Sequence, residues 1–91
     1  MQYVVCYDIA DDARRSRVAR TLLDFGKRVQ ESVFVAHLDG ELAERMRERV
    51  MRLVDVDWDR VHVFALCEAC GRRSEALGTA VVAEDPEWYI V

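Results

Sequence analysis

Apolar and polar residues alternate along the chain in a pattern that predicts short strands and two amphipathic helices. Residues 3–7, with the sequence YVVCY, form an apolar run that is rich in β-forming residues and shows little alternation. This run predicts a central strand that is covered on both faces or lies at a dimer interface. Asp11 and Asp12 are N-cap candidates for a helix that Gly26 is placed to end. The helix is expected to run to about Phe25, with a sheet-facing stripe of Val18, Ala19, Leu22, Leu23 and Phe25.

The middle of the chain combines strand composition with a second helical pattern. Residues 28–38, RVQESVFVAHL, predict either one long strand or two short strands turned at Glu31 and Ser32, and no Gly or Asn marks a turn. Asp39 is expected to cap a helix from about Glu41 to Val54. Glu and Arg residues at i, i+4 spacing indicate that one face of this helix is solvated. Its apolar face is expected to consist of Leu42, Met46, Val50 and Leu53 or Val54.

The last third of the chain predicts one more strand and a β tail. Residues 61–66 alternate between two faces and predict a strand. The segment EACGRR is then expected to turn the chain, and residues 74–91 to supply two short β segments broken at Gly78 and Pro86. The order β-α-β(β)-α-β with an extra tail is the ferredoxin-like α+β plan, provided that residues 28–38 form a hairpin. This plan leaves one sheet face open for a partner.

Length and composition favour one small folded domain. A chain of 91 residues with 52% hydrophobic and 33% charged residues can bury one core, and a homodimer that buries more surface is expected. The first residues have no basic start and no long apolar run, which argues against a signal peptide and a membrane span. Three cysteines are too few for a secreted disulfide framework. We therefore expect a cytoplasmic protein.

Charge is distributed unevenly along the chain. The net charge of −4 argues against a protein that coats nucleic acid non-specifically. However, residues 1–30 hold six Lys and Arg against four Asp and Glu, whereas residues 31–91 hold seven against thirteen. A phosphate-binding surface is therefore expected to draw mainly on the first third of the chain.

Asp8 is the most specific single candidate for chemistry. It is the first charged residue after the apolar strand, so its carboxylate is expected at the sheet edge near a helix N-terminus. An acid at this place can also merely support the cap or a turn, and one carboxylate is a poor metal site. A two-fold dimer would bring two copies of Asp8 together, and Mg²⁺ accepts one or two carboxylates with water and substrate phosphate.

Three arginines follow in the first turns of the predicted helix, where the helix dipole disfavours cations. Arg15 is expected on the core-facing side, within reach of the end of the first strand. There it can bind phosphate, or form an ion pair with Asp8 or Asp11. We expect Arg14 to face solvent, and Arg15 and Arg17 to contact phosphate.

The remaining candidates favour structural roles. Cys67 and Cys70 have the spacing of half a zinc site or a redox pair, but no second pair or histidine stands at zinc spacing. We interpret them as turn-associated thiols, with zinc or a disulfide between subunits as the alternative. His37 and His62 are expected as polar strand residues, and Trp58 as a packing residue of the connector. The sequence shows no catalytic triad and no cluster of glycines that could cradle phosphate.

One long stretch joins several of these features. The segment VVCYDIADDARRSRVARTLLDFGKRVQESVF contains a strand ending in Tyr-Asp-Ile, then Asp-Asp with arginines, then Gly-x-Arg-Val-Gln-x-Ser-Val-Phe. Together with LCEACGRRSEALG and EDPEWYIV, it resembles the CRISPR-associated Cas2 proteins over nearly the whole chain. The combination is specific, although each piece alone is not.

The resemblance implies a ferredoxin-like homodimer in which residues 84–91 add a strand to the partner protomer's sheet, and it favours the hairpin near Glu31 and Ser32. It implies a role in acquiring CRISPR spacers, as a DNA-holding dimer between copies of the Cas1 integrase. Some members are described as Mg²⁺-dependent nucleases on RNA or DNA, and Asp8 matches their catalytic and metal-binding aspartate. The positions that match other residues tied to substrate binding or activity are Tyr7, Arg15, Arg17, Arg28, Ser32 and Phe34.

Two functions therefore compete. The first is an endonuclease in which paired Asp8 carboxylates hold Mg²⁺ while arginines position the strand. The second is a scaffold that grips DNA and docks on the integrase through the tail EWYIV, without chemistry of its own. A toxin-like RNA-cleaving relative or a small regulatory module is a third interpretation, which an adjacent integrase gene and repeat array would exclude.

Overall fold

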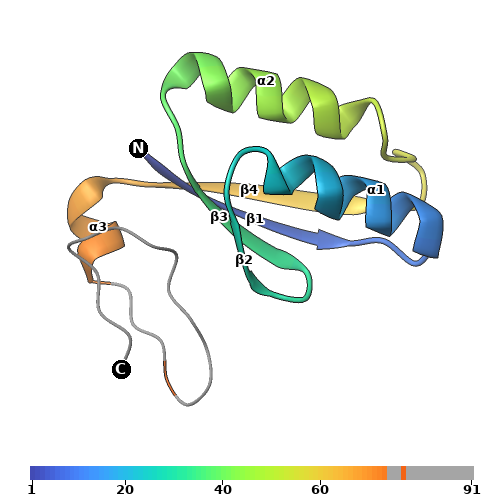
Figure 1. The fold of residues 1–91 in the computed structure, drawn as a ribbon, viewed down its shortest axis with the longest axis horizontal. Coiled ribbons are helices and arrows are strands. Elements are labelled where there is room, and N and C mark those ends of the chain that lie inside the picture. The colour runs from blue at the N-terminus through green and yellow to red at the C-terminus, as the bar shows by residue number, and fades with distance from the viewer. Residues whose placement is uncertain (74–76, 78–91) are drawn as a thin grey trace.

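The chain folds into an antiparallel sheet with two long helices on one of its faces (Figure 1). The structure is a computed structural model that describes residues 1–73 and 77. The sheet has four strands in the order β2-β3-β1-β4, so the predicted central strand is central. The α+β ferredoxin-like prediction is thereby confirmed. The elements are β1 (Gln2–Asp8), α1 (Asp12–Leu23), β2 (Lys27–Gln30), β3 (Val33–His37), α2 (Gly40–Met51), β4 (Arg60–Leu66) and α3 (Glu68–Arg72).

Two parts of the sequence-based prediction need comment. The segment EACGRR does not simply turn the chain, because its first five residues form the short helix α3. The predicted β tail of residues 84–91 lies outside the described residues. Within the part of the chain that the structure describes, no helix is long and apolar enough to span a bilayer.

The alternative of a hairpin for residues 28–38 is the one that the structure adopts. β2 and β3 pair in antiparallel fashion, with the turn at Glu31 and Ser32 and an irregularity between Arg28 and Gln30. Gly26 allows the chain leaving α1 to pass close to β3. A Cβ atom at this position would lie 2.3 Å from the Val35 carbonyl oxygen, which is far closer than any side chain tolerates.

Both long helices begin where the sequence predicts. The Asp11 carboxylate accepts a hydrogen bond from the Arg14 backbone N–H at 2.8 Å, and Asp39 accepts one from Leu42 at the same distance. These bonds satisfy N–H groups that the first turn leaves without an intrahelical partner. The helices end at Leu23 and Met51, slightly earlier than predicted.

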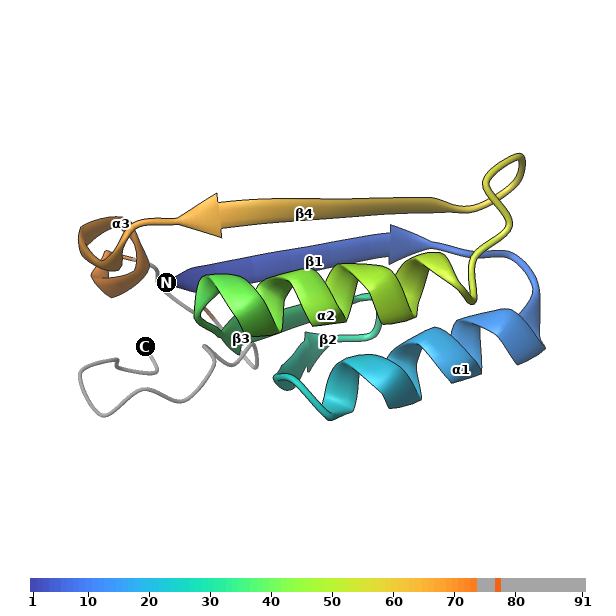
Figure 2. The same ribbon diagram turned by 90° about the horizontal axis from the view of Figure 1, so that it is seen from above.

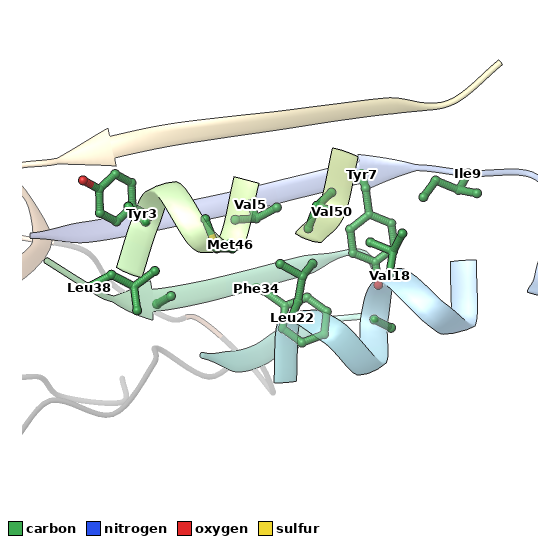
Figure 3. Close-up of a cluster of buried hydrophobic side chains, with 13 residues drawn as sticks. Tyr3, Val5, Tyr7, Ile9, Val18, Leu22, Phe34, Leu38, Met46 and Val50 are labelled. Carbon is green, nitrogen blue, oxygen red and sulfur yellow. The ribbon is translucent and has the colours of Figure 1, made fainter. Parts of the chain in front are cut away.

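The core lies between the two helices and the sheet (Figure 3). Its largest fully buried side chains are Phe34, Leu22, Met46, Val5 and Val18. Three expectations about packing were wrong. Leu42 is 39% exposed, because α2 turns Ala43 rather than Leu42 towards the sheet. Leu23, expected in the sheet-facing stripe of α1, is 57% exposed, and Trp58 is 79% exposed instead of packing the connector.

The opposite face of the sheet is covered by neither α1 nor α2, as the views in Figures 1 and 2 agree. Alternation along β1 places Val4, Cys6 and Asp8 on this face, and the register places Val35 and Phe64 beside Val4. Most of its apolar side chains are half-buried, and Phe64 is 52% exposed. We call this surface the open face. Its residues are Val4, Cys6, Asp8, Val33, Val35, Arg60, His62, Phe64 and Leu66.

Candidate functional site

Asp8 is the last residue of β1, and its side chain is exposed at the end of the strand that leads into α1. Among the residues that the structure describes, none hydrogen-bonds or ion-pairs with its carboxylate. The carboxylate therefore does not support the helix cap, which Asp11 provides. An exposed acid without a structural task is available to a ligand.

The loop after Asp8 is fixed by Arg15. One terminal nitrogen of its guanidinium donates to the carbonyl oxygens of Ile9 and Ala10, at 3.0 and 3.4 Å, and the other forms an ion pair with Asp12. The expected structural pairs of Arg15 with Asp8 or Asp11 are not formed, because Asp12 lies one helical turn before Arg15 on the same side. Arg15 thus holds the backbone next to Asp8.

Arg14 does not face solvent as expected. Its guanidinium binds the Asp59 carboxylate through two bonds of 2.8 and 3.0 Å, and the Asp59 side chain is 1% exposed. Asp59 also accepts the Asp55 backbone N–H. The hydrogen bond from Arg14 and then that from Asp55 lower the pKa of Asp59, and the same contact raises the pKa of Arg14. The pair joins the start of α1 to the loop before β4.

Tyr7, Arg28 and Phe34 form one cluster at the same end of the sheet. Tyr7 and Phe34 stack with their ring centroids 6.1 Å apart, and the Arg28 guanidinium lies 5.4 Å from the Phe34 centroid. The Tyr7 hydroxyl donates to the Glu31 carbonyl at 3.2 Å and accepts from Arg28 at 3.5 Å. Ser32 lies in the adjoining turn, where its carbonyl accepts the Tyr7 backbone N–H at 3.1 Å.

The residues of this cluster that match positions tied to substrate binding in the Cas2 proteins have different roles here. The rings of Tyr7 and Phe34 are buried, at 5% and 1% exposed, so they are core residues that position the hairpin. Arg28 is exposed, and stacking on a ring orients its N–H donors. Arg28 is therefore the member of the cluster that can contact phosphate.

Arg17 does not belong to the surface around Asp8. It lies on α1 beside a surface hollow of about 340 Å³ between the two long helices, which Arg20 and Arg49 also line. Within the described part of the chain its guanidinium makes no hydrogen bond or ion pair. Arg49 in the same hollow is bound to Asp24 at 2.8 Å. Arg17 thus belongs to a second basic surface on the helical layer.

Arg60 is the neighbour of Asp8 that sequence reasoning missed. It is the first residue of β4 and pairs directly with Asp8 in the antiparallel register, so both side chains belong to the open face. Like Asp8 it is exposed and has no ion pair among the described residues. Only the register of β1 with β4, which spans 52 positions of sequence, reveals this neighbour.

Metal-binding side chains are sparse around Asp8 in the described part of the chain. Residues 1–73 and 77 contain no group of three or more His, Cys, Asp or Glu side chains that could hold a metal. A single chain therefore cannot enclose an ion with its own described side chains. The exposed Asp8 oxygens nevertheless suit Mg²⁺, which binds few carboxylates and keeps water and phosphate as its other ligands.

Comparison with known proteins gives a consistent family. Residues 1–74 match the family model described as CRISPR associated protein Cas2. The CRISPR-associated endoribonuclease Cas2 4 of Rhodospirillum rubrum is 40% identical over 91 residues, which cover 99% of this chain and 73% of that protein.

Solved structures agree in sequence and in shape. A hypothetical protein from Thermus thermophilus is 38% identical with a TM-score of 0.81, and the match covers 91% of this chain and 96% of that one. The crystal structure of Streptococcus pyogenes Cas2 is 29% identical with a TM-score of 0.77, covering 86% of this chain and all of that one.

Proposed function

This chain belongs to the family of CRISPR-associated Cas2 proteins, and from that premise we propose that it is a metal-dependent endonuclease that acts in CRISPR adaptation. The observation that carries the proposal is the exposed Asp8 carboxylate, which lies opposite Arg60 and has no partner among the described residues. The relative from Rhodospirillum rubrum is named an endoribonuclease, which supports RNA phosphodiesters as one substrate class.

The neighbouring residues suit a phosphodiester substrate. Arg60 offers N–H donors to a phosphate oxygen next to the Asp8 carboxylate, and such charge-assisted bonds also stabilise negative charge that develops during cleavage. Arg28 lies at the same end of the sheet, beside Phe34 on the helix face, where its exposed guanidinium can bind a further phosphate. Arg15 keeps the backbone after Asp8 in place, so it acts as a positioning residue.

Mg²⁺ is the cofactor that we propose, held between the Asp8 carboxylates of two protomers. Bound at this place, the ion supplies Lewis-acid polarisation of the phosphodiester and activation of water. The part of this chain is to present the Asp8 carboxylate on a fixed backbone, which the β1 ladder and the Arg15 bonds hold in place.

A homodimer is required by this proposal and is supported by the open face. Val4, Cys6 and Asp8 alternate onto the same face of β1, so an apolar contact between two open faces has the acids at its end. If the two-fold axis of such a contact runs parallel to β1, it places the two copies of Asp8 at the same end of the interface.

The test compares Asp8→Asn with Asp57→Asn, since Asp57 is an exposed acid of the connector before β4. Purified chain with Mg²⁺ is incubated with single-stranded RNA and with duplex DNA. We expect Asp8→Asn to lower cleavage by roughly 100-fold or more, the scale expected for an essential electrostatic group. Asp57→Asn is expected to cut at the wild-type rate. Equal cleavage by the Asp8 variant would refute the catalytic assignment.

A second comparison tests the phosphate contact. Arg60→Gln is expected to weaken substrate binding and to lower the salt dependence of affinity by about 0.9 log units per log unit of salt, the value for one phosphate on duplex DNA. Arg45→Gln, on the exposed side of α2, is the matched control. If both variants bind equally well, Arg60 does not contact the substrate.

A non-catalytic scaffold is the second candidate. It is favoured by the side chains of Tyr7, Arg15 and Arg28, which are engaged in structural contacts. It is also favoured because no group of three or more metal-binding side chains is found among the described residues. In this case the dimer holds DNA and bridges subunits of the Cas1 integrase. Spacer acquisition that survives Asp8→Ala but fails on deletion of residues 87–91 would favour this function, and integrase binding that does not need these residues would refute the docking role.

A further inference from the structure

Two of the three cysteines lie at the end of the sheet opposite to Asp8. Cys67 directly follows β4, and Cys70 lies in α3. The helix α3 lies near the N-terminus in both views (Figures 1 and 2). In the register of β1 with β4, Leu66 pairs with Gln2, whereas Asp8 pairs with Arg60. Six residues of strand separate these positions by roughly 20 Å. The cysteines are therefore a separate feature from the site around Asp8.

The two cysteine side chains contact each other. The Cys70 backbone N–H donates a hydrogen bond to the Cys67 sulfur at 3.4 Å. Both residues are exposed, and neither is in a disulfide. Because the shared turn already brings the side chains together, a bond between the two sulfurs requires little movement of the chain.

The surroundings of the two thiols give them different pKa values and therefore different reactivities. Hydrogen bonds from the Cys70 backbone N–H and from the Cys70 thiol lower the pKa of Cys67, and the same thiol contact raises the pKa of Cys70. Cys67 is therefore the better nucleophile, since the thiolate is the reactive form. Cys70 keeps its proton and is placed to react second.

We propose that Cys67 and Cys70 form a redox-active dithiol that exchanges with low-molecular-weight disulfides such as glutathione disulfide. The Cys67 thiolate attacks one sulfur of the small disulfide, whose S–S bond breaks and releases one thiolate that is protonated by solvent. Cys70 then loses its proton and attacks the Cys67 sulfur, which releases the second small thiol. The protein loses two protons and two electrons, and the small disulfide gains them.

A zinc ion is the alternative partner of such a pair of cysteines. A structural zinc site has four ligands, and Cys67 and Cys70 supply two. Among residues 1–73 and 77 no third His, Cys, Asp or Glu joins them. The dithiol is complete within one described chain, whereas the zinc site would need ligands from elsewhere.

The experiment uses the full chain with Cys6→Ser, because Cys6 is a third thiol half-buried on the open face. The protein is equilibrated with glutathione mixtures from fully reduced to fully oxidised, then alkylated and weighed by mass spectrometry. We expect both thiols to become resistant to alkylation together as the mixture becomes more oxidising. The oxidised protein should then be lighter than the reduced, unalkylated protein by two hydrogen atoms. Circular dichroism checks that each variant is folded.

Single variants identify the order of attack. Cys70→Ser is expected to trap glutathione on Cys67, and Cys67→Ser to react at least roughly tenfold more slowly at Cys70. The proposal is overturned if both thiols stay alkylatable in every mixture, or if each takes up glutathione without forming an internal disulfide. It is also overturned if added zinc shields both thiols and a chelator then releases the metal. None of these results depends on nuclease activity.

Discussion

The two faces of the sheet are built from the same strands and the same kinds of residue, but they differ in how much of their apolar surface is buried. On the helix face, Val5 and Phe34 are each 1% exposed under α1 and α2. On the open face, Phe64 is 52% exposed, and Val4 and Cys6 are half-buried. The difference indicates that the helix face stabilises the single chain, whereas the open face leaves apolar side chains exposed next to Asp8 and Arg60, as the dimer proposed above requires.

The largest expected effect tests the helix face. Leu22→Ala should lower the free energy of unfolding by about 2 to 5 kcal/mol, because Leu22 is 1% exposed and its removal leaves a cavity. The adjacent Leu23 is 57% exposed, so Leu23→Ala should change the unfolding free energy by less than about 0.5 kcal/mol. Urea denaturation of both variants measures the difference. Equal losses would mean that α1 packs through a different stripe.

The next effect tests the open face. Phe64→Ala should weaken self-association by roughly tenfold or more, which corresponds to about 1.4 kcal/mol, because it removes a large aromatic ring that is 52% exposed on this face. Sedimentation over a range of protein concentrations measures the dissociation constant. Val56→Ala is the control, since Val56 is exposed in the connector away from the sheet. An unchanged association constant for Phe64→Ala would place the interface elsewhere.

A smaller effect concerns the Arg14–Asp59 pair at the border of the helix face. The pKa of Asp59 is lower in the folded protein than its ordinary value, so the pair stabilises the fold above the ordinary carboxyl pKa. This stabilisation is lost as the pH falls through the folded-state pKa. Asp59→Asn should therefore be less stable than the wild type at neutral pH, and the two should converge in acid. Thermal unfolding at several pH values measures this, and a constant difference would contradict the assignment.

These contacts also show how far the sequence alone leads. Both helix caps, the buried stripe of Val18, Ala19 and Leu22 on α1 and the central place of β1 follow from local patterns, because caps and apolar spacing act within one helix or strand. The Arg14–Asp59 pair and the Asp8–Arg60 neighbourhood join residues 45 and 52 positions apart. No local pattern encodes such pairs, since they depend on the strand register and on how the connector folds back.

The orientation of α2 shows a similar limit within one element. The spacing of Leu42, Met46 and Val50 predicts a buried stripe, yet Ala43 is fully buried and Leu42 is 39% exposed. A small residue allows α2 to approach the sheet closely, so packing between elements turns Ala43 rather than Leu42 to the core while Met46 and Val50 stay buried. Hydrophobicity alone does not distinguish these two rotations of the helix.

The smallest effect lies on the solvent side of α2, on neither face of the sheet. Glu41 and Arg45 form an ion pair at 3.5 Å with side chains 80% and 64% exposed. A double-mutant cycle with Glu41→Gln and Arg45→Gln should give a coupling of only about 0.2 to 0.5 kcal/mol, and 1 M salt should reduce it, because water and ions screen exposed charges. Urea denaturation of the four proteins measures the coupling. A coupling as large as the loss in Leu22→Ala would contradict the view that the helix face dominates the stability of the chain.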